Sequence, residues 1–128
     1  MKNQLLETLL KIQKKIYKTK DNSIPQLLEI NKNEIDFIKS KFNIGDVEAL
    51  FLATSCIITI SDCDFDFGID EISFFLAINN LEVLLHKDSL QNLLNKQLLQ
   101  VKNTDTKTMI PFLKVEFTLH SSTIKHFN

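Results

Sequence analysis

The sequence predicts a mainly α (α+β) fold, in which N-terminal helices precede a winged helix-turn-helix with a small antiparallel sheet. Apolar residues recur at helical spacing in several segments, and residues 112–119 alternate apolar and polar side chains as a strand does. From residue 46 onward the order is helix, short strand, helix, tight turn, helix and hairpin, which is the order of a winged helix. We expect a single domain over 1–128, with N-terminal helices in 1–45 and the winged-helix core in 46–128.

The N-terminal part is predicted to hold two helices and a short turn. The first helix covers residues 3–18 and has a stripe of Leu5, Leu9, Ile12 and Ile16, widened by Leu6, Leu10 and Tyr17. Pro25 favours a short helical turn over 24–29. Asn31 is the expected N-cap of the second helix, with Glu34 three residues later. The buried face of that helix is predicted to be Ile35, Phe37, Ile38 and Phe42.

The next helix is predicted to lie at the centre of the domain. Gly45 is the expected left-handed cap that ends the preceding helix, and Asp46 the expected N-cap of this one. Residues 47–60 are apolar nearly all round the helix, which is typical of a helix buried on every side.

The predicted winged helix continues with a short strand over 65–69. Asp70 is the expected N-cap of a helix over 71–76, and residues 77–79 form a tight turn. Asn80 then caps a longer helix over 81–96. The inner side of that helix is predicted to be Leu81, Leu84, Leu85, Leu90, Leu93 and Leu94.

The wing is predicted from the end of the chain. Residues 97–102 are expected to be extended, and 103–107 to form a polar hairpin tip. The alternating segment 112–119 supplies the second strand. Ser121 or Ser122 then starts a final helical turn that ends at Phe127.

The stretch SDCDFDFGIDE, residues 61–71, resembles a calcium-binding loop at first sight. Starting from Asp62, the acids at positions 1, 3 and 5 of such a loop are present. The glycine required at position 6 is replaced by Phe67, and the closing glutamate at position 12 by Ser73. We therefore expect no metal site here, but a strand with outward aspartates that leads to a helix N-cap.

The charge of the chain gives little support for a polyanionic partner. The formal net charge is −1, and all 15 basic residues counted in that charge are Lys. Charge is uneven along the chain, at +4 for 1–41, −7 for 42–80 and +2 for 81–128. Arg, the usual bidentate reader of guanine and phosphate, is absent, which lowers the expectation of sequence-specific DNA binding.

Six polar side chains on the predicted recognition helix and wing are the candidates for contact with a partner or with DNA. They are His86, Lys87, Gln91, Lys96, Lys102 and Lys107. On the helix, two Lys are offset by two acids, which favours protein contact over phosphate contact.

No motif indicates catalysis, a cofactor or a metal. The chain has two glycines and no phosphate-binding loop, and its three histidines are too scattered for a metal motif. No signal-peptide or CxxC pattern is present, and the longest apolar run is too short to span a bilayer, so we expect a cytoplasmic protein without a membrane partner. The lysine-rich first helix has a membrane-surface or partner-helix alternative, but such a stripe normally packs on the core.

Two segments resemble a known family. FNIGDVEALFLATSCI (42–57) and FGIDEISFFLAINNLEVLLHKDSLQNLLNKQLL (67–99) resemble the N-terminal region of a group of bacterial AAA-family ATPases. In that group a helix with an "sxxEaxflA" pattern precedes a small winged helix. The resemblance covers 30–103 and implies a regulatory or substrate-recognition region ahead of an ATPase ring. The Walker motifs of the ATPase are absent, so the chain is either an N-terminal fragment or a stand-alone relative.

Together these observations predict a non-catalytic module that recognises a protein partner or belongs to an attached AAA-type ATPase. The alternative is a winged-helix transcriptional regulator that binds DNA. Partner recognition predicts an exposed apolar patch or groove, beside either the first helix or the recognition helix.

Overall fold

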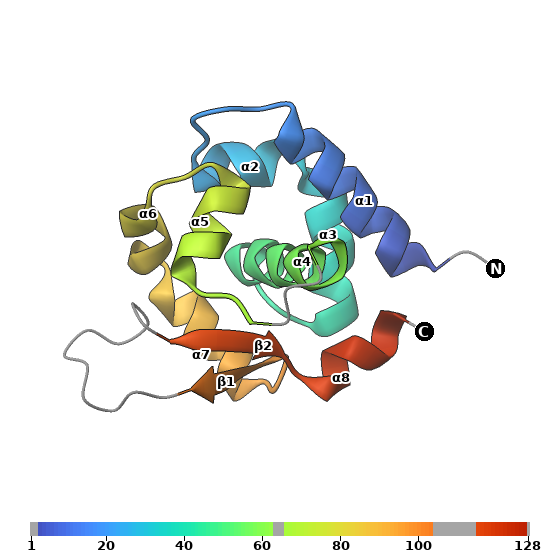
Figure 1. The fold of residues 1–128 in the computed structure, drawn as a ribbon. Helices are drawn as coiled ribbons and strands as arrows, with labels where there is room; N and C mark the ends of the chain where they lie inside the picture. Colours follow the sequence, from blue (N-terminus) through green and yellow to red (C-terminus); the bar gives the residue numbers. More distant parts are fainter. Residues whose placement is uncertain (1–2, 63–65, 104–114, 128) are drawn as a thin grey trace.

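The computed structural model describes residues 3–62, 66–103 and 115–127 and confirms a mainly α fold with a small antiparallel sheet (Figure 1). Its elements in chain order are α1 (Gln4–Tyr17), α2 (Ile24–Ile30), α3 (Lys32–Phe42), α4 (Asp46–Ser61), α5 (Ile69–Leu76), α6 (Asn80–Leu85), α7 (Lys87–Asn95), β1 (Leu99–Asn103), β2 (Glu116–Leu119), α8 (Ser121–Ile124) and the 3₁₀ turn η1 (Lys125–Phe127).

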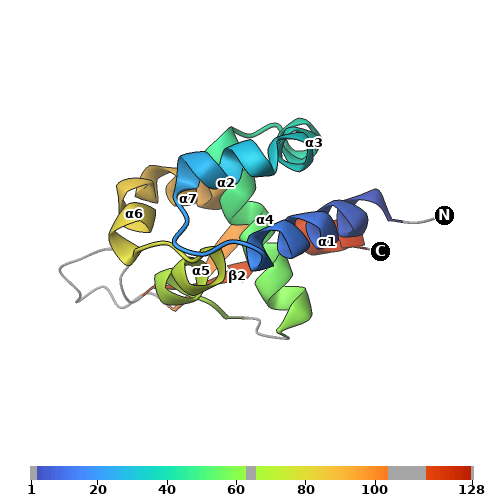
Figure 2. The ribbon, with the colours of Figure 1, turned by 90° about the horizontal axis from the view of Figure 1, so that it is seen from above.

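The central helix is α4, as its sequence predicts. Every side chain from position 49 to position 59 is buried. Figures 1 and 2 show α1 on one side of it and α5 on the other, and Figure 1 shows the sheet beneath it. The hydroxyls of Thr54, Ser55 and Thr59 each donate to the carbonyl four residues earlier at 2.8 Å. These bonds allow polar side chains inside an apolar core, because a buried hydroxyl without a partner is destabilising.

The N-terminal helices pack on α4 through the stripes that the sequence predicts. Leu5, Leu9, Ile12 and Ile16 of α1 are buried, whereas the three residues expected to widen the stripe are exposed. Lys15 of α1 forms an ion pair with Glu34 of α3 and donates to the Ile30 carbonyl at 3.1 Å. In α3, Ile35 and Ile38 are buried, and Phe37 and Phe42 are half-buried.

One predicted helix start is confirmed in position, and two other predicted helix ends are wrong. Asn31 is the N-cap of α3, but its side chain makes no capping bond; its amide instead donates to the Leu27 carbonyl at 2.9 Å, inside the core. The left-handed residue that ends α3 is Asn43 (φ 57°), because Asn enters that region more readily than most other non-glycine residues. Gly45 is extended and precedes α4 as its N-cap, so Asp46 becomes the first helical residue.

The predicted long helix over 81–96 is two helices. Asn79, not Asn80, caps α6, and its side chain accepts from the Leu81 N–H at 2.8 Å. The chain then breaks at His86 before α7 begins. In one continuous helix Lys87 would follow buried Val83 by four residues and share its face; the break leaves Lys87 exposed.

This break changes which leucines are buried. Leu90 and Leu93 are buried and Leu84 and Leu94 half-buried, as predicted for the inner side. The prediction that Leu81 and Leu85 also face inward is wrong: both are exposed on α6, where Val83 is the buried residue.

The sheet pairs β1 with β2 in antiparallel register, with Leu99 opposite Leu119 and an irregularity between Val101 and Asn103. Of the predicted strand over 65–69, the described part holds one bridge, in which Phe67 exchanges backbone bonds with Phe117 at 3.0 and 2.7 Å. Ile69 already belongs to α5. The hairpin tip from 104 to 107 and the strand residues 112–114 lie outside the described residues.

Hydrogen bonds join the N-terminal helices to the later part of the chain. The Asn22 amide and backbone N–H donate to the carbonyls of Leu76 and Ala77, both at 2.9 Å. The Glu82 carboxylate of α6 accepts from the N–H of Ile24, at the start of α2, at 2.7 Å. One buried core includes side chains from both parts of the chain.

The first and last described residues belong to segments that lie near each other, α1 and the turn η1 after α8 (Figure 1). The Asn3 amide donates to the His126 carbonyl at 3.0 Å, and the His126 ring meets Phe42 edge to face at 5.0 Å. Burial lowers the pKa of His126, and the charges of Lys41 and Lys125 lower this pKa further.

Across the described residues, no single helix has the length and apolarity needed to cross a membrane. The pair α3 and α4 meets that test only when taken together, and the two are bent by 93°.

Candidate functional site

The residues predicted for partner or DNA contact do not form one cluster of unengaged cations. Lys96 donates to the Asn43 carbonyl at 2.5 Å, and Lys102 is paired with Asp66. The Asp66 hydrogen bond and charge, together with Glu116, raise the pKa of Lys102.

The remaining predicted residues have different surroundings. Lys87 is exposed at the start of α7. Gln91 is exposed and donates to the Asn95 amide oxygen at 3.0 Å, while His86 is half-buried at the break between α6 and α7. Lys107 lies outside the described residues.

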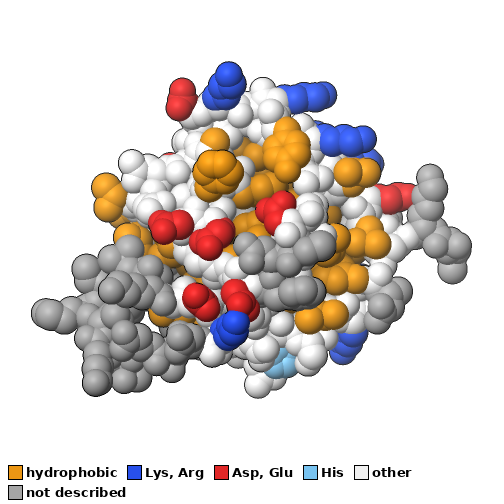
Figure 3. Space-filling view, viewed as in Figure 1, with side chains coloured by type: hydrophobic (Ala, Val, Ile, Leu, Met, Phe, Trp, Pro, Cys, Tyr) orange, Lys and Arg blue, Asp and Glu red, His pale blue; other side chains and the backbone are white. Residues whose placement is uncertain are grey.

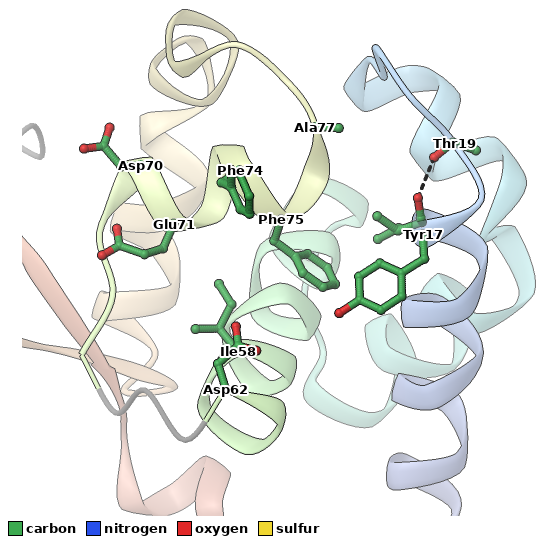
Figure 4. A pocket seen from close by; sticks show the side chains of 10 residues that line it. Tyr17, Thr19, Ile58, Asp62, Asp70, Glu71, Phe74, Phe75 and Ala77 are labelled. Atoms are coloured by element: carbon green, nitrogen blue, oxygen red, sulfur yellow. Dashed lines mark hydrogen bonds between the residues drawn. The ribbon is translucent and has the colours of Figure 1, made fainter.

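A hollow among the described residues lies between the end of α1 and α5, with α4 beneath. It has a volume of about 640 Å³, within the range of about 300–1,000 Å³ typical of ligand sites. Figure 4 shows Tyr17 of α1 and Phe75 of α5 pointing toward one another, with Ile58 of α4 below. We call this hollow the aromatic groove; its lining residues are Ile16, Tyr17, Thr19, Ile58, Asp62, Asp70, Glu71, Phe74, Phe75 and Ala77.

Two exposed aromatic rings border the aromatic groove. The Phe74 side chain is 89% exposed and Tyr17 is 67% exposed. Tyr17 and half-buried Phe75 have ring centroids 6.1 Å apart at 60°. Bulky apolar side chains are therefore exposed beside a hollow, which is a feature of protein-interaction sites.

The sequence of α5 explains why Phe74 faces outward. Ile69, Ile72, Ser73 and Leu76 are buried and repeat at the three- and four-residue spacing of one helix face. Phe74 follows Ile69 by five residues, which places it about 140° around the helix from that stripe. Sequence reasoning did not single out Phe74, but this spacing was sufficient to place it on the surface.

Carboxylates form one rim of the groove. Asp70 accepts from the Asn80 amide at 2.7 Å, and Glu71 accepts from the Gly68 N–H at 3.0 Å. Gly68 therefore precedes α5 as its N-cap, and the prediction that Asp70 has this role is wrong. Acids in a first helical turn are favourable for the helix dipole, so α5 itself accounts for Asp70 and Glu71.

Asp62 has no such explanation. It follows the last residue of α4, and its backbone N–H donates to the Ile58 carbonyl at 3.1 Å. A negative charge at a helix C-terminus opposes the dipole. The lining of the aromatic groove thus contains three acids and no lysine.

A smaller hollow of about 140 Å³ lies further along α1, against the end of α4. Leu6, Leu10 and Ile60 line it and are exposed. Gln13 also lines this smaller hollow and donates to Tyr17 Oη at 3.2 Å and to Ser61 Oγ at 3.1 Å. Figure 3 shows hydrophobic side chains gathered on this face, with acidic side chains beside them.

Two further reactive side chains, Cys56 and His120, are buried or engaged. Burial raises the pKa of the Cys56 thiol, which keeps it protonated. His120 caps α8 by accepting from the Ser122 N–H at 3.1 Å. Within residues 3–62, 66–103 and 115–127, no three His, Cys, Asp or Glu side chains lie close enough to hold a metal ion.

Comparisons with protein-family models, with curated proteins and with solved structures find no match to this chain. The function must therefore be inferred from the aromatic groove and from the order of the elements.

Proposed function

We propose that this chain is a non-catalytic regulatory module that recognises a protein partner through the aromatic groove. The observation that carries the proposal is the 89% exposed ring of Phe74 beside a hollow that Tyr17 and Phe75 also line. Folding alone gives little reason to keep a bulky aromatic side chain in water, whereas aromatic residues are enriched where proteins bind one another. The groove lies beside the first helix, one of the two places where the sequence predicts an apolar patch.

We also propose a winged-helix architecture for residues 46–127. In support, α4, the Phe67 bridge, α5, the turn at residues 77–79, α6 with α7, β1 and β2 follow in winged-helix order. β2 lies between the Phe67 bridge and β1, because Phe117 pairs with both Phe67 and Val101.

The attached partner that we propose is an AAA-type ATPase module, on the strength of the resemblance in residues 42–57 and 67–99. In such an arrangement the groove selects a protein and the ATPase acts on it. The genomic reading frame beyond residue 128 tests this part of the proposal: an in-frame ATPase supports it, and an immediate stop codon contradicts the attached form.

Selection of displayed random peptides on the purified chain tests recognition at the groove. The enriched peptides are measured by fluorescence anisotropy on the wild type, on Phe74→Ala and on Leu85→Ala. Leu85 is the matched control, because it is 82% exposed but lies on α6 outside the groove. We expect Phe74→Ala to weaken binding at least about tenfold, as for an interface anchor, and Leu85→Ala to leave it unchanged. Equal binding to all three chains would refute recognition at this groove.

DNA binding by α7 is the second candidate function. The observation that favours it is the exposed Lys87 at the start of α7, in the helix pair that follows the turn. It predicts salt-dependent binding to a DNA duplex that weakens in Lys87→Ala and Lys96→Ala. If anisotropy detects no duplex binding at low salt, this candidate is rejected.

A further inference from the structure

We propose that the occupant of the aromatic groove is a basic amphipathic helix, with apolar side chains on one face and Lys or Arg on the other. This inference rests on the proposed function, because it names the partner of the same groove. It follows from the charge of the rim, the arrangement of the two hollows and the position of Asp62.

The charge of the rim selects a cationic partner. Asp62, Asp70 and Glu71 line the groove, and the segment 42–80 that supplies all three contains seven acids and no Lys. Opposite charges around an apolar contact steer the encounter and reject partners of the wrong sign. Nucleic acid and anionic lipid are therefore disfavoured at this groove.

Asp62 strengthens this interpretation. Its position after α4 places a negative charge where the helix dipole disfavours one, whereas the dipole of α5 accounts for Asp70 and Glu71. A cationic ligand would offset that unfavourable charge. Asp62 is therefore the acid of the groove whose charge is favourable only when such a partner is bound.

The two hollows set the shape of the ligand. Both lie along α1, because Leu10 lines one and Tyr17 lines the other, and Gln13 of the smaller hollow donates to Tyr17 Oη. Tyr17 follows Leu10 by seven positions along the helix, which corresponds to a rise of about 10 Å. A partner helix presents side chains at i and i+7 at the same separation, so two apolar anchors can occupy the two hollows together.

The experiment uses two labelled helical peptides with the same leucine and phenylalanine positions at i, i+3 and i+7. One carries Lys at its polar positions and the other Glu. Fluorescence anisotropy gives the Kd of each for four chains: the wild type, the rim variant Asp62→Asn/Asp70→Asn/Glu71→Gln, Phe74→Ala and a charge control.

The variants are chosen to keep the fold. Gln at position 71 still accepts the Gly68 N–H as a capping-box residue. Asn at position 70 keeps an oxygen for the Asn80 amide. The charge control, Glu29→Gln/Asp36→Asn/Asp88→Asn, removes the same charge from exposed sites outside the groove. Thermal unfolding by circular dichroism checks that each variant folds.

We expect the lysine peptide to bind the wild type at least about tenfold more tightly than the glutamate peptide. A few exposed ion pairs together account for a preference of this size. The rim variant should lose most of that preference, and the charge control should retain it within about twofold. Added salt should weaken binding to the wild type more than to the rim variant.

The outcomes separate the two proposals. If both peptides bind equally and Phe74→Ala still abolishes binding, the basic partner is refuted and the groove stands. If the lysine peptide binds with no effect of Phe74→Ala, recognition at the groove itself is refuted. Concentration-dependent self-association that Phe74→Ala removes would replace the basic helix by a second copy of this chain.

Discussion

Two phenylalanines seven residues apart allow a direct test of whether Phe74 serves folding or binding. The Phe67 side chain is 1% exposed, its ring stacks on that of Phe117 at 6.2 Å, and its backbone forms the bridge to β2. Phe74 is 89% exposed on the outer face of α5. The same substitution, Phe→Ala, should therefore have very different effects on the free energy of unfolding at the two positions.

The magnitudes follow from burial. Phe67→Ala removes a fully buried ring and should destabilise the protein by about 3–5 kcal/mol. At position 74, about a tenth of a side chain of roughly 200 Å² is lost from contact, worth about 0.5 kcal/mol at 25 cal/mol per Å². Ala is a better helix former than Phe by several tenths of a kcal/mol, so Phe74→Ala should leave the free energy of unfolding within about 0.5 kcal/mol of the wild type.

Urea unfolding followed by far-ultraviolet circular dichroism measures both variants. The reasoning requires a large drop in the urea midpoint for Phe67→Ala and almost none for Phe74→Ala. A loss of more than about 1.5 kcal/mol in Phe74→Ala, far outside the usual effect of surface substitutions, would show that the ring packs on the fold. The aromatic groove would then not be an open binding surface.

Four further predictions concern stability, and urea unfolding measures each of them. Ala77 ends α5 in the left-handed region (φ 57°), so Ala77→Gly should be neutral or raise the free energy of unfolding by up to about 1 kcal/mol. A clear loss of stability would contradict backbone strain at Ala77. Asn22→Ala should destabilise by about 1–2 kcal/mol, because it leaves the Leu76 carbonyl without its side-chain donor; an unchanged midpoint would contradict that role. The lowered pKa of His126 means that the unfolded chain holds this proton more tightly, so stability falls as the pH drops below about 6.5. His126→Gln should lose less stability than the wild type between about pH 7.5 and pH 5.5, and equal losses would refute this linkage. Asp62→Asn should stabilise by about 0.3–1 kcal/mol at low salt, by removing a charge that opposes the α4 dipole, and a loss would contradict the dipole argument.

The central helix and the stripes of α1 and α3 were predictable, because their apolar spacing leaves one way to bury them. Helix ends were less predictable where two adjacent residues compete for one role. Gly45 and Asp46 both suit the start of α4, and the choice depends on Asn43 taking the left-handed conformation two residues before Gly45. Such a choice is set by how the helices meet, which a local pattern does not contain.

The break at His86 and the groove were missed for different reasons. A helix over 81–96 satisfies the spacing of Leu90 and Leu93, and the position of Lys87 was the one local signal against continuity. The groove joins α1 to α5, which are about 50 residues apart in sequence, so its walls are brought together by tertiary packing alone. Phe74 itself was within reach of the sequence, since the stripe of α5 leaves it on the outer face.

The acids of SDCDFDFGIDE differ in what the fold gains from them, and this difference bears on function. Asp66 pairs with Lys102, and Asp70 and Glu71 stabilise the start of α5. Asp62 opposes the dipole of α4 and lines the aromatic groove. If the proposed basic ligand is correct, Asp62→Asn must act in opposite directions, raising the stability of the isolated chain and weakening its complex with the lysine peptide. If Asp62 has no role in binding, Asp62→Asn should raise the stability of the isolated chain and leave the affinity for the lysine peptide unchanged. The two measurements on one variant therefore distinguish an unfavourable charge at the helix end from a charge that contributes to binding.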